Sequence, residues 1–162
     1  MILNSSAFDD LASSLLEVVP MVLHALRSHM RMNRSVELSV PQFRALAYVR
    51  RHEAASLSDV AGHMGLTAPS ASRLVDVLVA RGFVERLMDP ADRRKVTIKA
   101  TDKGLDAWST TREETLHWLA ELLGGLSPAQ AAELTRSLKT LRVVFDGPAA
   151  RGEDPEEDGA GP

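Results

Sequence analysis

The chain contains no cysteine, and this absence removes several kinds of chemistry at once. Disulfide bonds, thiolate metal sites and thiol redox sensing all need a cysteine sulfur. Aromatic residues make up only 4% of the chain, whereas apolar residues of all kinds make up 44%. Packing must therefore rest on Leu, Val, Ala and Met, which favours a mainly helical fold.

Long apolar runs and catalytic motifs are also missing. No uninterrupted apolar stretch approaches the roughly 18 residues of a membrane span. Asp9 and Asp10 come early, where a signal peptide would be apolar. The five histidines lack the spacing of a metal site, and the chain has no nucleophile elbow and no glycine-rich phosphate loop. We therefore expect a cytoplasmic protein that is not an enzyme, uses no cofactor or metal and has no membrane partner.

Negative charge is concentrated at the C-terminus. Of the 162 residues, positions 146–162 hold six acidic residues and one basic residue, and their composition predicts a disordered acidic tail. The rest of the chain has a net charge of +2, and residues 67–104 alone have +3. The overall charge of −3 therefore does not argue against a nucleic-acid partner.

Capping patterns and apolar spacing predict the helices. Apolar residues at helical spacing between Leu11 and Met30 predict an N-terminal helix, which Pro20 would kink or divide into two. A Ser-x-x-Gln or Ser-x-x-Asp capping box opens a helix at each of three places, namely Ser39, Ser56 and Ser127. The first of these helices should run to about residue 52 and the second should end at Gly65. The third has the 3-4 spacing of a helix that packs against another helix.

Residues 66–104 combine a helix with a two-stranded ribbon. Thr67 should cap the helix by accepting a backbone N–H bond, and Gly82 should end it in a left-handed conformation. Two strand-like runs, 83–87 and 95–100, flank the turn Asp89-Pro90-Ala91-Asp92-Arg93-Arg94. A helix of this size enters a major groove about 12 Å wide, while an arginine-tipped ribbon reaches the adjacent minor groove.

This segment resembles the winged helix-turn-helix of MarR-type transcription regulators. The resemblance rests on Ser72-Arg73-Leu74-Val75-Asp76, on the Asp89–Arg94 turn and on Thr101-Asp102-Lys103-Gly104, and the element order matches from about Asp9 to Phe145. It implies a mainly α fold with a small β-wing, in a homodimer that binds pseudo-palindromic double-stranded DNA, more often as a repressor than as an activator. We accordingly expect one domain over residues 1–145, with a reading head at about 40–100 and dimerisation helices at about 8–31 and 102–145.

The predicted DNA contacts lie on the helix and on the wing, at Thr67, Ser70, Ser72, Arg73, Arg93, Arg94 and Lys95. Arg73 can instead pair with Asp76 three residues later, which contributes only ~0.2–0.5 kcal/mol. A bidentate arginine–guanine contact discriminates by ~1–3 kcal/mol, so the DNA role is the more informative one. The serines can bind phosphates or base edges, and the wing arginines can equally be solvated turn charges.

The resemblance also implies a cleft for a small aromatic or anionic effector between the reading head and the dimerisation helices. The residues that would line it are His24, Arg27, Tyr48, His52 and Trp108, each of which can equally be a core or surface residue. Two alternatives to a DNA-binding regulator stay open. One is a winged helix used as a protein-interaction module, and the other is a small-molecule or metal sensor without DNA binding.

Overall fold

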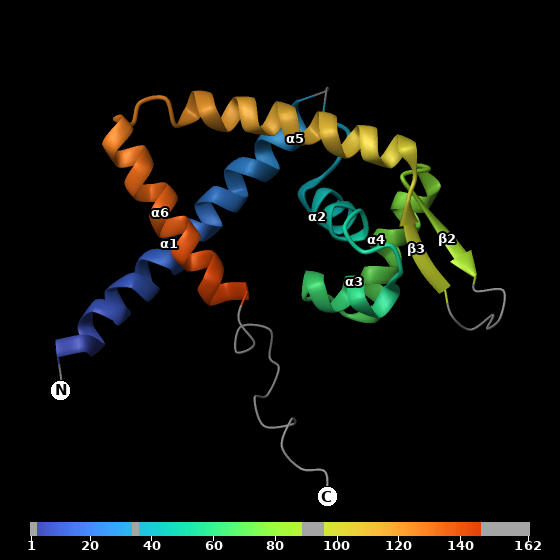
Figure 1. The fold of residues 1–162 in the computed structure, drawn as a ribbon, viewed down its shortest axis with the longest axis horizontal. Coiled ribbons are helices and arrows are strands. Elements are labelled where there is room, and N and C mark those ends of the chain that lie inside the picture. Colours follow the sequence, from blue (N-terminus) through green and yellow to red (C-terminus); the bar gives the residue numbers. More distant parts are fainter. Residues whose placement is uncertain (1–2, 34–35, 89–95, 147–162) are drawn as a thin grey trace, which may run out of the picture. The chain divides into compact units, whose positions relative to one another are not determined.

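The computed structural model describes residues 3–33, 36–88 and 96–146 (Figure 1). The wing turn with Arg93, Arg94 and Lys95 and the acidic tail from residue 147 lie outside the described residues. The protein is mainly helical with a small antiparallel sheet, as the sequence predicts. The chain separates into two compact units, Met1–Trp118 and Leu119–Pro162. The prediction of one domain to residue 145 stays a prediction.

The first unit begins with α1 (Leu3–Met32), a single continuous helix with Pro20 inside it. The alternative of two separate helices is therefore wrong. Most of α1 is exposed, and only Met30 is buried, where it packs with the residues that lead into the next helix. Residues Ser6–Met32 are long and apolar enough to cross a membrane by length and composition alone.

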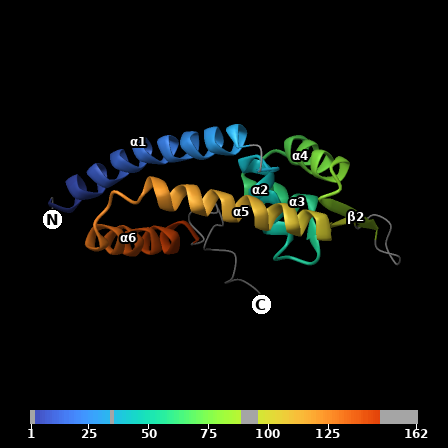
Figure 2. The same ribbon diagram turned by 90° about the horizontal axis from the view of Figure 1, so that it is seen from above.

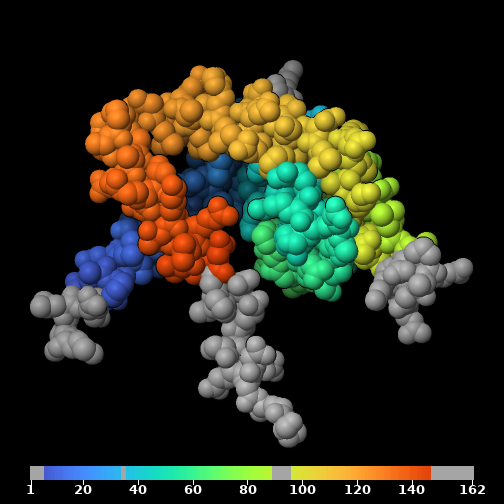
Figure 3. Space-filling view, viewed as in Figure 1, coloured from blue at the N-terminus to red at the C-terminus, as the bar shows by residue number. Residues whose placement is uncertain are grey.

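Three short helices follow: α2 (Val40–Val49), α3 (Leu57–Met64) and α4 (Ala68–Ala80). The predicted capping box opens α2, where the Ser39 N–H donates to Gln42 Oε1 at 2.9 Å. The helix ends at Val49, about three residues before the predicted end at residue 52. At the start of α3 the predicted capping box forms. The N–H of Ser56 donates to Asp59 Oδ2 at 2.8 Å, and the N–H of Asp59 donates to Ser56 Oγ at 3.2 Å. In Figure 3 the teal surface of α2 and the green surface of α3 lie side by side.

The sheet contains three antiparallel strands in the order β1-β3-β2, formed by β1 (Ala55–Ser56), β2 (Val84–Met88) and β3 (Val96–Ala100). The two wing strands lie within one residue of their predicted positions. Sequence analysis did not predict β1, because two residues are too few to show an alternating pattern. The strands β2 and β3 pair along their whole length, from Val84 opposite Ala100 to Met88 opposite Val96.

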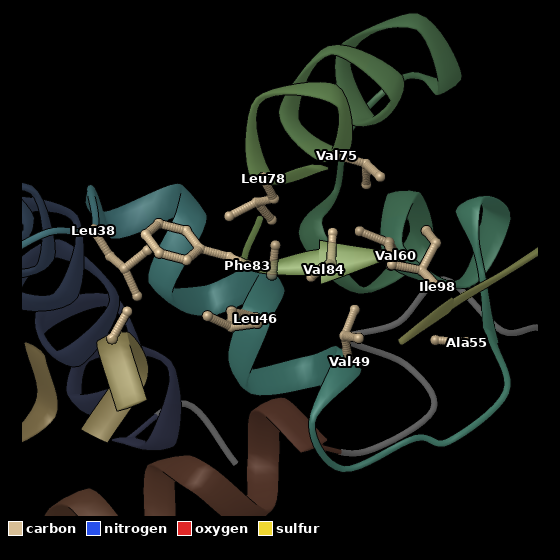
Figure 4. Packing of buried hydrophobic residues seen from close by; sticks show 12 residues of the cluster. Leu38, Leu46, Val49, Ala55, Val60, Val75, Leu78, Phe83, Val84 and Ile98 are labelled. Carbon is tan, nitrogen blue, oxygen red and sulfur yellow. The ribbon is translucent and has the colours of Figure 1, made fainter. Parts of the chain in front are cut away.

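The reading head has its own hydrophobic core. Its members come from α2, α3, α4, the sheet and the connections between them (Figure 4), and the most buried are Leu38, Leu46, Val60, Val75, Leu78, Phe83, Val84 and Ile98. Because α4 contributes Ala71, Val75 and Leu78 to buried positions, one face of this helix is fixed against the core. The opposite face is then left for solvent or a ligand.

The helix α5 (Asp102–Leu122) begins where the wing ends. The Thr101 hydroxyl accepts the N–H of Gly104 at 3.0 Å and donates to the carbonyl of Gly82 at 2.7 Å, so Thr101 caps the start of α5. Gly104 packs so closely on the residue before β2 that a Cβ at this position would overlap the carbonyl oxygen of Phe83. The α5 helix can approach the head this closely only because residue 104 is glycine.

In the second unit, α6 (Pro128–Asp146) begins with the predicted capping box at Ser127 and Gln130. None of its described residues is buried. Five large apolar side chains of α6 are exposed, namely those of Leu134, Leu138, Val143, Val144 and Phe145. The helix therefore has a clear start signal and an apolar face that its own unit does not cover.

Candidate nucleic-acid interface

The exposed face of α4 follows from its buried face. Residues Ala71, Val75 and Leu78 point into the core, so the 3.6-residue repeat turns Ser70, Arg73 and Val77 away from it. The Arg73 side chain is exposed, and Val77 keeps 45% of its surface accessible. Figure 2 shows α4 at the margin of the first unit.

The start of α4 differs from the prediction. The Thr67 side chain makes no cap bond to a backbone N–H; its hydroxyl donates instead to Ser70 Oγ at 3.0 Å. Pro69 stands at the second helical position and has no N–H, so the N–H of Ser70 is the remaining donor for a cap, and it makes no bond to the Thr67 side chain. Thr67 and Ser70 thus form a pair of hydroxyls at the positive end of the helix, a suitable environment for a phosphate oxygen.

Arg73 does not form the intrahelical pair that the sequence allowed. Asp76 instead accepts a 2.7 Å salt bridge from Arg86 of β2, because that strand runs past α4. The Arg73 Nε donates to the Pro69 carbonyl at 3.3 Å, and no carboxylate of the described residues forms a salt bridge with its guanidinium. Arg73 therefore keeps charge and donors for a ligand outside the protein.

Ser72 lies on a different side of α4 from Arg73. It is half-buried, and its hydroxyl points along the helix to Asp76 Oδ2 at 3.5 Å. The Asp76–Arg86 salt bridge, which joins the helix to the wing, was not predicted because its partners come from separate elements. The DNA role of Ser72 stays a prediction.

The described part of the wing ribbon ends at the last pair of β2 and β3. Met88 and Val96 are its last described pair, and the turn with Arg93, Arg94 and Lys95 lies between them, outside the described residues. Lys99, on β3, is exposed. The sequence left the role of Lys103 open, and its Nζ donates to the carbonyl of Arg81 at 2.9 Å.

The turn after α4 holds a set of contacts that the sequence did not reveal. Arg81 Nη1 donates to the Glu37 carbonyl at 2.6 Å, and Arg81 Nη2 lies 3.5 Å from the Glu37 carboxylate. Gly82 takes the predicted left-handed conformation with φ 71°. Together with the bonds from Thr101 and Lys103, these contacts fix the C-terminal end of α4 to the start of α5 and to the segment before α2. Only the glycine signal was visible in the sequence, since Arg81 and Glu37 are 44 residues apart.

The five candidate effector residues do not come together in one place. His24 lines an open pocket of about 390 Å³ with Ser28, His29, Met32 and Trp118, and the ring of His29 stacks on Trp118 at 4.3 Å. Arg27 is exposed and does not line this pocket. The other three candidates belong to two further aromatic clusters.

Tyr48 stacks on His52 at 4.1 Å and on His63 at 4.4 Å, so the two imidazoles take opposite faces of its ring. Burial and the nearby carboxylate of Asp59 raise the pKa of Tyr48. Burial, followed by the positive charges of Arg44, Arg51 and His52, lowers the pKa of His63. This cluster sits where α2 and α3 pack together.

Trp108 of α5 stacks on Phe43 at 5.5 Å, and the Arg50 guanidinium lies 4.0 Å from the centre of the same ring. Trp108 and Tyr48 both pack against the head core, which gives each a structural role. Within the three described stretches, no three histidine or carboxylate side chains gather closely enough to hold a metal ion.

Comparison with known proteins agrees with this geometry. A family model described as "MarR family" matches residues 37–95, from the segment before α2 to the end of the wing turn. The HTH-type transcriptional repressor IacR of Pseudomonas putida is 26% identical over 71% of this chain and 67% of its own length.

Two solved structures have the same fold. CouR from Rhodococcus jostii RHA1, bound to p-coumaroyl-CoA, superposes with a TM-score of 0.62 at 26% identity, over 82% of this chain and 92% of that one. Streptococcus pneumoniae FabT in complex with DNA superposes with a TM-score of 0.66 at 18% identity, over 86% and 97%. The winged helix-turn-helix segment, residues 37–95, is matched by the MarR family model, and the chain is similar to transcription regulators of that family.

Proposed function

We propose that this protein binds double-stranded DNA sequence-specifically as a homodimer, recognises a pseudo-palindromic operator and represses transcription until a small-molecule effector binds. The observation that carries the proposal is the exposed face of α4. There Arg73 forms no salt bridge with the described carboxylates, because Asp76 is engaged by Arg86.

In this proposal α4 enters the major groove and Arg73 donates two bonds to a guanine. The hydroxyls of Thr67, Ser70 and Ser72 contact phosphates or base edges near the start of the helix. The wing extends the interface, with Arg93 or Arg94 in the minor groove and Lys95 on a phosphate. The antiparallel β2–β3 ribbon supports this role, since it is paired up to Met88 and Val96 and so carries the turn on a rigid base.

The homodimer is supported by apolar surface on the helices outside the head. Leu16 and Met21 of α1 are 78% and 69% exposed, and Leu138 and Val144 of α6 are 64% and 60% exposed. Each helix by itself therefore carries several exposed large apolar side chains, and exposed apolar surface of this kind marks an association site. Two copies of α4 placed about one DNA turn apart, ~34–36 Å, would read the two half-sites of a pseudo-palindrome.

The effector is supported by CouR, which has the same fold and binds p-coumaroyl-CoA. The pocket beside His24 is our preferred location, and Arg27, Tyr48, His52 and Trp108 stay secondary candidates because they lie outside its lining. The repressor assignment is supported by the name of IacR. A protein that acts on chromosomal DNA would work in the cytoplasm, without an enzymatic reaction or a cofactor.

The test has two stages. Wild-type protein selects a binding sequence from genomic fragments, and fluorescence anisotropy then measures its affinity for that operator and for a scrambled duplex across salt concentrations. We expect a strong preference for the operator. The logarithm of the binding constant should fall linearly with the logarithm of the salt concentration, with a slope of about −0.9 for each phosphate that the protein neutralises. Equal affinity for the scrambled duplex would contradict sequence-specific binding.

Variants assign the roles. Arg73→Ala should weaken operator binding by about 5- to 150-fold and relax selectivity at one base pair. Arg94→Ala should weaken binding to all sequences and reduce the salt slope. Arg136→Ala, an exposed α6 arginine outside the reading head, is the matched control and should keep operator selectivity. If neither Arg73→Ala nor Arg94→Ala changes DNA binding, the winged helix serves a protein partner instead.

A further inference from the structure

Val77 is an apolar side chain on the face of α4 that points away from the core. It follows Arg73 by four residues and Ser70 by seven, so the helical repeat places it within about 40° of the first and about 20° of the second. Arg73 is exposed, Ser70 is half-buried and Val77 keeps 45% of its surface accessible. The three side chains therefore form one stripe, in which a cation, a hydroxyl and two methyl groups face outward together.

Folding does not explain a valine at this position. The core face of α4 is supplied by Ala71, Val75 and Leu78. A β-branched residue lowers helix propensity relative to alanine, and an exposed one gains little from burial in return. Its neighbour Asp76 has a structural partner in Arg86, whereas the Val77 methyl groups lie on the opposite flank of Arg73. An apolar side chain on this exposed face of α4 can contribute to binding when the ligand presents an apolar group opposite it.

We infer that Val77 is a specificity-determining residue that contacts the C5-methyl group of a thymine in the major groove. This inference rests on the proposed DNA-binding function. Thymine alone among the four bases presents a methyl group there, and apolar side chains are its natural partners. The spacing of Ser70, Arg73 and Val77 at i, i+3 and i+7 is also one that reading helices use in the major groove.

The geometry predicts where the thymine lies. Val77 is about 6 Å further along the helix axis than Arg73, at 1.5 Å per residue. Base pairs are stacked about 3.4 Å apart, so a helix lying along the groove places Val77 roughly one to two base pairs from the guanine of Arg73. Each half-site should therefore contain a guanine with a thymine one or two positions away.

The experiment removes the methyl group from the DNA and from the protein separately. The operator selected by wild-type protein is resynthesised with deoxyuridine replacing that thymine, which deletes only the methyl group. Wild-type protein should bind the deoxyuridine operator about fourfold more weakly for each half-site changed. Val77→Ala should bind the thymine operator more weakly than wild type and should not distinguish the two operators, while its melting temperature is unchanged or higher.

Glu53→Ala is the control, because it truncates an exposed side chain in the turn after α2, away from α4, the wing and the proposed dimer helices. This variant should bind the deoxyuridine operator more weakly than the thymine operator by the same factor as wild type. Val77→Thr retains one methyl group and the branched shape, so it should keep part of the difference in affinity between the two operators. This variant replaces Val77→Ala in the experiment if Val77→Ala does not fold.

The possible failures are distinguishable. If wild-type protein selects no sequence, the proposed function fails. If it selects an operator but Val77→Ala and wild type lose the same affinity on deoxyuridine, or if the half-site has no thymine within two base pairs of a guanine, the inference about Val77 is overturned.

Discussion

The helices α3 and α6 start with the same device and have different surroundings. In α3 the Ser56–Asp59 capping box has bonds of 2.8 and 3.2 Å, and in α6 the Ser127–Gln130 box has bonds of 2.9 and 3.3 Å. Yet α3 buries Val60 completely in the head core, whereas no described residue of α6 is buried within its own chain.

This difference separates helix formation from helix stabilisation. A cap contributes about 1 kcal/mol, and most of the stability of a helix in a protein comes from packing its apolar face. The reading head covers its apolar faces with its own core, while α6 leaves its face open. The head should therefore be stable in dilute solution, and the outer helices should depend on a second copy of the chain.

Gly104→Ala should have the largest effect on stability, because it disrupts the packing of α5 against the reading head. The new Cβ would overlap the Phe83 carbonyl, which belongs to the backbone and cannot move away without displacing β2. We expect a loss of more than about 4 kcal/mol in the free energy of unfolding, measured by urea denaturation. Gly62→Ala is the control. A Cβ at position 62 of α3 meets nothing within 4 Å, so stability should stay constant or rise.

Two leucine truncations sharpen the contrast between head and outer helix. Leu46→Ala leaves a cavity in the head core, where the side chain is 0% exposed, and should cost about 2–5 kcal/mol at every protein concentration. Leu138→Ala removes a 64% exposed side chain of α6. Its cost should show as weaker self-association in sedimentation equilibrium, with little effect on the unfolding of dilute protein. A core-sized loss for Leu138→Ala in dilute protein would contradict the distinction.

Arg81→Gln tests how the head joins its neighbouring segments, with a smaller expected effect. The variant removes both the bond to the Glu37 carbonyl and the ion pair with the Glu37 carboxylate. We expect a loss of about 0.5–1.5 kcal/mol in urea denaturation. Glu37→Gln deletes only the charge of an exposed pair and should cost less, about 0–1 kcal/mol. Equal losses in the two variants would show that the backbone bond contributes nothing.

The smallest effect concerns pH. Because burial and nearby positive charges lower the pKa of His63 in the folded protein, the unfolded chain binds more protons as the pH falls. The stability that neutral His63 provides is present above its ordinary pKa of about 6.5 and is lost as the pH falls toward the lowered value. His63→Gln should flatten the decline of the urea midpoint between about pH 7 and pH 5. An unchanged decline would place its origin elsewhere.

Local signals in the sequence were sufficient wherever the interaction is local. The capping boxes at Ser56 and Ser127 and the left-handed Gly82 all formed as predicted. The predicted Thr67 cap is wrong, since the Thr67 hydroxyl pairs with the Ser70 hydroxyl and not with a backbone N–H. The two-residue strand β1 gave no signal, because its pairing with β3 depends on residues more than 40 positions away.

Candidate site residues divide in the same way. The sequence alone named Arg73 as a predicted DNA contact and Asp76 as its alternative partner, but the salt bridge of Asp76 to Arg86 depends on where β2 passes α4. The five effector candidates were chosen because they share helices, and the structure distributes them among three clusters and one exposed position. Spacing along a helix fixes direction relative to that helix only, so it cannot say which side chains of different helices meet.

The sequence by itself determined the resemblance to the MarR family, the order of the helices and the wing strands. These features depend on contacts between residues close in sequence, for which the regular geometry of a helix or strand fixes the directions of the side chains. Only the tertiary structure decided that Asp76 forms a salt bridge with Arg86 of the wing, that Arg81 contacts Glu37 and that Gly104 must lack a side chain. Each of these brings together residues from separate elements, and the packing of the whole head decides which of them meet.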